Sequence, residues 1–303
     1  MMCRMTDISR RQFVALAAAG AGLAPFAPAQ NTITAQQIID RIRSRLTRLD
    51  VEWKTASVDT VKAGDATAAI TGIATTALPT VDVLRRAVKA GANMVITCGP
   101  TFYSRTDTPT LPSKPGAAAA PDAILSAKDE FIRKNGLVVW RFSDHWRLRA
   151  PNPFARGLAD ALGWSTVPIA GDPAALAIPE TSLDALAARV KQRLAARGGI
   201  RVVGNPGLRV RKVGLLPGST PVQASLALLP AVDVVIAGEV REWESVEYAR
   251  DTLTAGGAKA LMLVGRVVSE DPGMQACAQW LGSVVPELKT TWLAAGDPYW
   301  RPR

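Results

Sequence analysis

The chain has 303 residues, of which 48% are hydrophobic and 20% are charged, an ordinary globular composition. Its length predicts one large or two small domains. After the first 30 residues no stretch approaches the roughly 18 unbroken apolar residues of a membrane span, so we expect no span in the mature chain.

The N-terminal segment has the pattern of an export signal. Arg10 and Arg11 precede an Ala/Gly-rich apolar stretch that ends in Ala-Pro-Ala at 27–29. This is typical of a twin-arginine signal with its cleavage site. We therefore predict a signal peptide at residues 1–29 and a periplasmic or other extracytoplasmic location. The alternative is a buried N-terminal helix, against which the glycine and proline interruptions argue.

The charge and the cysteines of the mature chain restrict its partners. Without the signal, 33 basic and 25 acidic residues remain, a net charge of about +8 that favours anionic partners in general. No basic stripe is interleaved with aromatic residues, so nothing points to nucleic acid. The arginines at 41–49 are expected on the solvated face of an amphipathic helix. Cys98 and Cys277 do not make a disulfide framework, and Cys277 is expected to be a small core residue of a helix.

Strand and helix patterns alternate along the rest of the chain. Strands are expected at residues 68–76, 93–98, 137–142, 200–204, 211–219, 232–240, 259–265 and 290–296. Helices are expected at residues 79–91, 122–136, 152–164, 182–197, 241–257 and 272–285, and an exposed loop at 106–121. This alternation predicts parallel βαβ units and an α/β fold.

Cap residues mark two of these helices most clearly. Thr80 is the expected N-cap of the helix at 79–91, with Val81, Leu84 and Val88 on its apolar face. Asn152 is the expected cap of the helix at 152–164 and is followed by proline at the first helical position.

Several kinds of chemistry are excluded by missing residues. His145 is the one histidine, so zinc proteases of the H-E-x-x-H type and histidine-rich metal centres are excluded. There is no G-x-S-x-G elbow and no G-x-x-x-x-G-K-[ST] loop. Classical serine hydrolysis and nucleotide-dependent phosphoryl transfer are therefore not expected.

Polar residues remain at the ends of predicted strands. They are Cys98, Asp144 with His145, Ser219, Glu239 and the segment 265–271. Polar groups delivered by several strands to one edge of a sheet form a typical α/β site. The alternative is that each residue only caps the helix that follows it, and that Asp144 and His145 form a surface ion pair rather than an oriented imidazole.

These residues resemble a known family. "ITGIATT", "NMVITCGPTFY", "VVIAGEV" and "LVGRVVSED" are similar to segments of the NIF-three-like dinuclear metal centre proteins, which are often labelled homologues of GTP cyclohydrolase 1 type 2. The resemblance covers the chain from about residue 34 onward. It implies two α/β domains with a cleft between them, at 30–160 plus 258–303 and at 161–257, and a hexamer.

The resemblance also implies a metal site whose ligands have been substituted. The family's ligand positions fall on Cys98, Gly99, Arg149, Arg266 and Glu270, and Glu270 alone matches outright. A guanidinium has no lone pair to give and stays charged, so an arginine cannot ligate a dication. A standard dinuclear site is therefore not expected.

Three functional hypotheses follow. The first is a metal-dependent hydrolase of a phosphate- or nucleotide-type substrate, with a single weak site of Glu270, Cys98 and His145 for Zn, Fe or Mn at low occupancy or none. The second is a metal-free, non-catalytic relative in which Arg149 and Arg266 bind an anionic small molecule. The third is a structural homo-oligomer.

Overall fold

The structure is a computed structural model that describes residues 32–104, 107–112, 119–120, 122–164, 168–169, 172–300 and 302. The segment Ile33–Arg303 forms one unit. Arg10, Arg11 and the expected signal peptide lie outside the described residues, as does half of the expected loop at 106–121. In the described part of the chain, no helix combines the length and apolar character that crossing a membrane requires.

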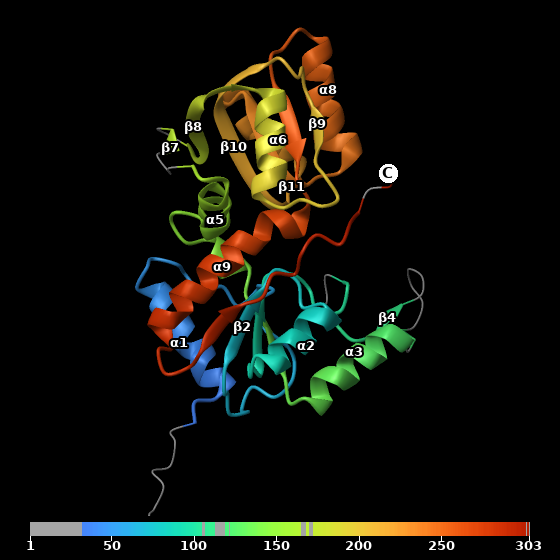
Figure 1. The fold of residues 1–303 in the computed structure, drawn as a ribbon. Coiled ribbons are helices and arrows are strands. Elements are labelled where there is room, and N and C mark those ends of the chain that lie inside the picture. The colour runs from blue at the N-terminus through green and yellow to red at the C-terminus, as the bar shows by residue number, and fades with distance from the viewer. Residues whose placement is uncertain are drawn as a thin grey trace, which may run out of the picture. The chain divides into compact units, whose positions relative to one another are not determined.

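The first sheet has five strands in the order β1-β6-β3-β2-β13 (Figure 1). They are β1 (Val61–Ala63), β2 (Ile73–Thr76), β3 (Met94–Thr97), β6 (Val138–Arg141) and β13 (Thr290–Trp292). All neighbours are parallel except β1 and β6. β2 and β3 are buried along their full length, as parallel strands covered on both faces should be.

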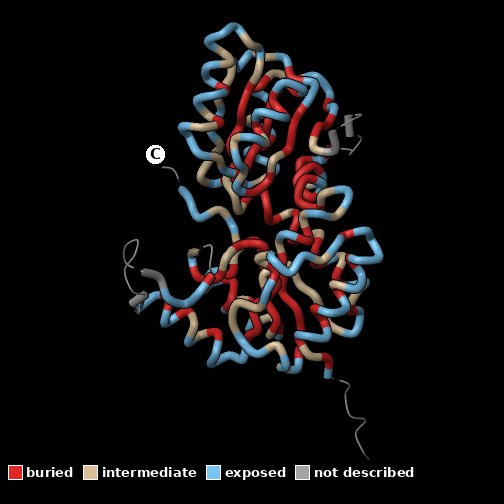
Figure 2. The backbone as a smooth tube through the Cα atoms, turned by 180° about the vertical axis from the view of Figure 1, so that it is seen from behind, coloured by how far each residue is buried: buried red, intermediate tan, exposed pale blue. Residues whose placement is uncertain are grey.

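Helices cover both faces of this sheet. They are α1 (Ala35–Thr47), α2 (Val81–Lys89), α3 (Ala123–Lys134) and α9 (Arg266–Val284). Met94 and Ile96 of β3 share a core with α1 and α9, whereas Val95 shares one with α2 and α3. This is the alternation that successive strand residues must show, and Figure 2 shows the buried strands inside exposed helical surfaces.

The start of α2 confirms one sequence prediction and corrects another. Thr80 is the N-cap, and its side chain accepts a hydrogen bond from the backbone N–H of Val83. Leu84 is buried as predicted, but Val81 is half-buried and Val88 is exposed. The helix turns Val83 and Leu84 towards the sheet, so its buried face is rotated from the predicted one.

The second sheet has six strands in the order β7-β8-β10-β11-β12-β9. They are β7 (Pro168–Ile169), β8 (Asp172–Ser182), β9 (Arg201–Val203), β10 (Arg209–Ser219), β11 (Val234–Glu239) and β12 (Ala260–Leu263). β10, β11 and β12 are parallel, while β7, β8 and β9 pair antiparallel. The α/β prediction is confirmed, but the sheets are mixed rather than purely parallel. The domain boundary predicted at residue 258 assigns β12 to the first domain. The hydrogen bonds between β12 and β11 instead place it in this second sheet.

Four more helices cover the second sheet. They are α5 (Pro153–Leu162), α6 (Leu183–Arg193), α7 (Val222–Leu228) and α8 (Glu247–Thr254). α5 and α6 share a core with one face, and α7 and α8 with the other. Asn152 caps α5, as predicted, by accepting from the N–H groups of Phe154 and Ala155.

Short elements complete the described chain. They are β4 (Leu111–Pro112), β5 (Ala119–Ala120), α4 (Asp144–Arg147), the 3-10 turn η1 (Leu229–Ala231) and the π-helical turn η2 (Glu242–Val246). The helix expected at 241–257 is therefore a π-helical turn followed by α8.

α9 runs from the second sheet to the first. It starts at Arg266 directly after β12, six residues before the predicted start at Pro272, which lies inside the helix. Gly265 precedes it with a φ of 94°, a conformation that favours glycine. Cys277 is buried in the core of the first sheet, as predicted. One helix thus carries Arg266 and Glu270 to the region between the two sheets.

Candidate functional site

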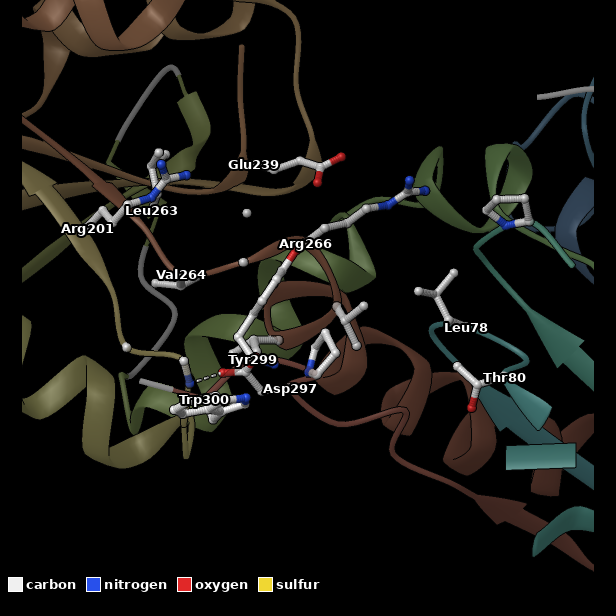
Figure 3. A pocket seen from close by; sticks show the side chains of 18 of the residues that line it. Leu78, Thr80, Arg201, Glu239, Leu263, Val264, Arg266, Asp297, Tyr299 and Trp300 are labelled. Carbon is white, nitrogen blue, oxygen red and sulfur yellow. Dashed lines mark hydrogen bonds between the residues drawn. The ribbon is translucent and has the colours of Figure 1, made fainter. Parts of the chain in front are cut away.

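A cleft of about 1060 Å³ lies at the carboxyl ends of strands from both sheets (Figure 3). Pro100 and Tyr103, after β3, line it from the first sheet. Glu239 at the end of β11 and Arg266 after β12 line it from the second. Ligands of α/β proteins bind outside the carboxyl ends of strands, so this cleft is the candidate site.

A buried carboxylate is held between two arginines beside this cleft. Glu270 is 3% exposed, and its Oε1 accepts from Nη2 of Arg147 at 2.9 Å while its Oε2 accepts from Nε of Arg266 at 3.2 Å. Arg147 also donates to the carbonyl of Pro217 at 3.1 Å. We call Arg147, Glu270 and Arg266 the arginine–glutamate cluster. It carries two positive charges and one negative charge.

The surroundings fix this cluster in place. A Cβ on Gly218 would lie 2.5 Å from Oε1 of Glu270, so the backbone of β10 packs directly against the carboxylate. Ser269 accepts from the N–H of Gly218 and donates to the carbonyl of Arg266. Burial alone would lower the pKa of Arg266, but the charge and the hydrogen bond of Glu270, with smaller contributions from Cys98 and Glu239, together outweigh it, and the pKa is raised. Arg266 therefore stays charged.

Cys98 lies at the end of β3 but is not available as a thiolate. It is 1% exposed, and its Sγ is 3.5 Å from the carbonyl oxygen of Ala77. Burial, with a smaller contribution from the charge of Glu270, raises the pKa of the Cys98 thiol well above its ordinary value. The neighbouring Gly99 has no room for a side chain, because a Cβ would lie 2.2 Å from Leu78. A neutral thiol is a poor metal ligand.

His145 has both ring nitrogens occupied. Its Nδ1 is 2.7 Å from Oδ2 of Asp59, and its Nε2 accepts the backbone N–H of Lys54 at 2.8 Å. Because Nε2 accepts, Nδ1 carries the proton and donates to Asp59, which leaves no lone pair for a metal. The ring is buried and stacks on Trp53 at 3.7 Å between centroids.

Asp59, not Asp144, is therefore the partner of the histidine. Asp59 also accepts the N–H groups of Ser143, Asp144 and His145, which begin α4. Asp144 itself accepts from the N–H of Val58. The two interpretations of the Asp144–His145 pair, an imidazole oriented by Asp144 and a surface ion pair, are therefore both wrong. The imidazole is oriented by Asp59, which lies 86 residues earlier in the sequence.

Arg149 lies apart from the cluster. Its guanidinium carbon is 4.6 Å from the ring centroid of Trp146 and 5.1 Å from that of Trp280, and burial lowers its pKa. It does not line the cleft. Of the two arginines predicted to bind an anion, Arg266 reaches the cleft and Arg149 packs on aromatic rings. Ser219, which is exposed at the end of β10, does not line the cleft either.

The residues predicted to bind a metal do not form a metal site. Glu270 is bound by two arginines, His145 has no free lone pair and Cys98 is a buried neutral thiol. Within the residues that the structure describes, no three His, Cys, Asp or Glu side chains are grouped so that they could hold an ion. The donor set therefore does not fit a divalent metal.

Lys128 is a cleft residue that sequence reasoning missed. It is 2% exposed on α3, donates to the carbonyl of Thr101, and lies 4.7 Å from the ring centroid of Tyr103. Burial lowers the pKa of Lys128 to about 8. No local pattern identifies it, because a lysine in the middle of a helix is ordinarily solvated. Arg147 was also missed, because its contact with Glu270 spans 123 residues of sequence.

The C-terminal segment forms a further wall of the cleft. Asp297, Tyr299 and Trp300 all line it. Asp297 accepts the N–H of Gly198 at 2.7 Å, which ties this segment to the loop after α6. Tyr299 and Trp300 are 69% and 71% exposed.

Comparison with known proteins gives the same fold. Residues 156–295 match the family model described as Duf34/NIF3 (NGG1p interacting factor 3). Over these residues the chain is similar to the Duf34/NIF3 family. The solved NIF3-type structures extend the likeness to most of the chain. No curated protein matches it significantly.

Three of those structures illustrate the likeness. The Staphylococcus aureus hypothetical protein SA1388 has 13% identity and a TM-score of 0.69, over 90% of this chain and 100% of that one. A Bacillus cereus protein related to NIF3 has 14% identity and a TM-score of 0.67, over 90% and 100%. Reduced HcgD from Methanocaldococcus jannaschii has 14% identity and a TM-score of 0.58, over 86% and 98%. At these identities the likeness concerns the fold alone. The two-domain α/β prediction is confirmed, the hydrolase and hexamer expectations stay predictions, and the expected metal is one that the donor set described above does not fit.

Proposed function

We propose that this NIF3-type protein binds an anionic small molecule in the cleft, without a pair of metal ions and without turnover. One observation carries the proposal. Arg266 uses its Nε for Glu270 and lines the cleft with a side chain that is 29% exposed. No residue in the described part of the chain accepts a hydrogen bond from its Nη groups. Figure 3 shows Arg266 among the lining residues, with its guanidinium on the side of Glu239 and away from Asp297 and Trp300.

The charges near Arg266 support an anionic ligand. The arginine–glutamate cluster has a net charge of +1, and Lys128 adds a second cation to the cleft. A guanidinium with free Nη groups offers parallel donors to a phosphate or carboxylate. Glu239 opposes this charge, since it lies near enough to raise the pKa of Arg266. Anion affinity therefore depends on the balance between Arg266 and Glu239.

The hydrolase hypothesis lacks the groups that it needs. It requires a metal ion to activate water, and the donors of Glu270, Cys98 and His145 are all engaged or protonated. The fixed guanidinium of Arg266 would also repel a dication. We therefore derive no hydrolytic step.

Two further proposals concern the setting of this function. The twin-arginine pattern at Arg10 and Arg11 supports export, so we propose that the protein acts in the periplasm or another extracytoplasmic compartment. The family resemblance supports a homo-oligomer, for which size-exclusion chromatography with light scattering is the direct measurement.

Metal analysis and anion titration test the proposal together. Protein purified without chelator should contain well below one transition-metal ion per chain, and dialysis against Zn²⁺ or Mn²⁺ should not raise this to two. Calorimetric titration with inorganic phosphate should show binding that Arg266→Gln abolishes and Glu239→Gln strengthens. Arg250→Gln is the matched control, because Arg250 is an exposed arginine paired with Glu247 outside the cleft. Two tightly bound ions per chain, or phosphate binding that is indifferent to Arg266, would refute the proposal.

A further inference from the structure

The C-terminal segment holds two aromatic side chains at the cleft on a fixed backbone. Beyond β13, the N–H groups of Ala295 and Gly296 each donate to Asp271 at 3.3 Å. Asp297 then accepts from Gly198 at 2.7 Å and from Tyr299 at 3.0 Å. These bonds fix the path of the chain up to Tyr299.

Close packing confirms that this segment is seated on the second sheet's side of the cleft. A Cβ on Gly198 would lie 2.4 Å from the Cβ of Tyr299, so the two backbones meet at a position that only glycine allows. The side chains of Tyr299 and Trp300 are nevertheless 69% and 71% exposed. Several hydrogen bonds therefore hold the backbone of this segment in place, although the two rings that it carries are exposed.

The other wall of the cleft offers a third exposed ring. Tyr103 follows β3, is 58% exposed and adopts a φ of 61°, in the left-handed region that is unusual for tyrosine. Its ring lies 4.7 Å from Nζ of Lys128. Exposed aromatic rings thus line the cleft from both walls, with Arg266 in the same cavity. Figure 3 shows Tyr299 and Trp300 together with Arg266.

From this arrangement we infer that the ligand is a planar aromatic ring that carries a phosphate or carboxylate group. The inference rests on the proposed function, in which Arg266 binds the anionic group. Exposed Tyr and Trp side chains bind planar rings through stacked or edge contacts that add to the area buried. A cleft of about 1060 Å³ is large for inorganic phosphate alone and suits an organic ligand of moderate size.

A pair of probes separates the aromatic contact from the anionic one. Phenyl phosphate and methyl phosphate share the anionic group and differ in the ring. We expect the full chain to bind phenyl phosphate at least tenfold more tightly, as measured by calorimetry. Trp300→Leu should remove most of this preference and leave methyl phosphate affinity unchanged, while Trp300→Phe retains it. Trp243→Leu is the matched control, because Trp243 is 72% exposed and lies outside the cleft.

Each outcome decides one of the two proposals. Equal binding of both phosphates that still depends on Arg266 overturns the aromatic ligand and leaves the proposed function intact. Binding of neither phosphate, or binding that ignores Arg266, overturns the proposed function and the inference with it. A Trp300→Leu protein with a changed molecular mass in solution and an unchanged ligand preference assigns the ring to contact with a second copy of the chain, which also overturns the inference.

Discussion

Removal of both arginines from the arginine–glutamate cluster should leave a buried charge without compensation. In an Arg147→Met, Arg266→Met protein, Glu270 keeps its place 3% exposed against the backbone of Gly218, but both of its oxygens lose their donors. Methionine preserves most of the packing of each side-chain stem. The variant therefore isolates the loss of the guanidinium groups.

The expected cost follows from the two bonds. Hydrogen bonds to charged groups contribute roughly 1.5–3 kcal/mol each. The side chains of Arg147 and Arg266 are 35% and 29% exposed, so water screens them and the lower end of that range applies. We expect the double variant to lose about 3 kcal/mol of unfolding free energy, consistent with roughly 3–5 kcal/mol for breaking a buried pair.

Addition of Glu270→Gln to the double variant should recover most of this loss. An amide of the same shape carries no charge, so its burial without arginines costs much less. Urea unfolding of the full cycle measures the coupling, with the midpoint shifting and the slope unchanged. If the triple variant is no more stable than the double variant, the loss comes from packing and not from an uncompensated carboxylate, and this account of the cluster is wrong.

Further predictions concern groups outside the cluster. Asp59→Ala should lower the unfolding free energy by about 3–5 kcal/mol, since it orphans three backbone N–H groups and the buried imidazole. Asp144→Ala removes one exposed acceptor and should cost about 1 kcal/mol in the same urea titration; equal losses would contradict this. Because burial lowers the pKa of Lys128 to about 8, the unfolded chain binds more protons between about pH 8 and 10.5. Stability should therefore rise with pH across that window, by up to roughly 1.4 kcal/mol per unit, and Lys128→Met should flatten the rise. Burial raises the pKa of the thiols of Cys98 and Cys277, so neither should react with a disulfide reagent at pH 8 in the folded chain without its signal segment, while both react in guanidinium chloride; a fast reaction in the folded protein would disprove their burial.

Local patterns predicted the elements well because their causes are local. Thr80 and Asn152 cap helices through neighbours two or three residues away, so the sequence itself contains both partners. The start of α9 was missed for a related reason. Pro272 is a common helix-start residue, and its acceptance inside a helix depends on packing that the sequence does not display.

The candidate site was only partly predictable because its contacts are distant. Glu270 and Arg266 lie four residues apart on one helix face, a spacing that a sequence displays. The partner of His145 is 86 residues away, and no spacing rule finds it. Arg147 and Arg149 are two residues apart in and after a helical turn, and such positions face different sides. The family resemblance pointed to Arg149 as the site residue, whereas in the structure Arg147 is the residue that contacts the carboxylate of Glu270.

The contact between α5 and α9 has a consequence for the width of the cleft. A Cβ on Gly157 would lie 2.7 Å from the carbonyl oxygen of Pro272, and one on Gly273 would lie 2.8 Å from the backbone of Phe154. Because Gly157 and Gly273 have no side chains, α5 and α9 can pack in direct backbone contact. Since this contact leaves no slack, we expect a rigid opening that discriminates between ligands by size, and an alanine at residue 157 to alter that selection without touching any group that meets the ligand.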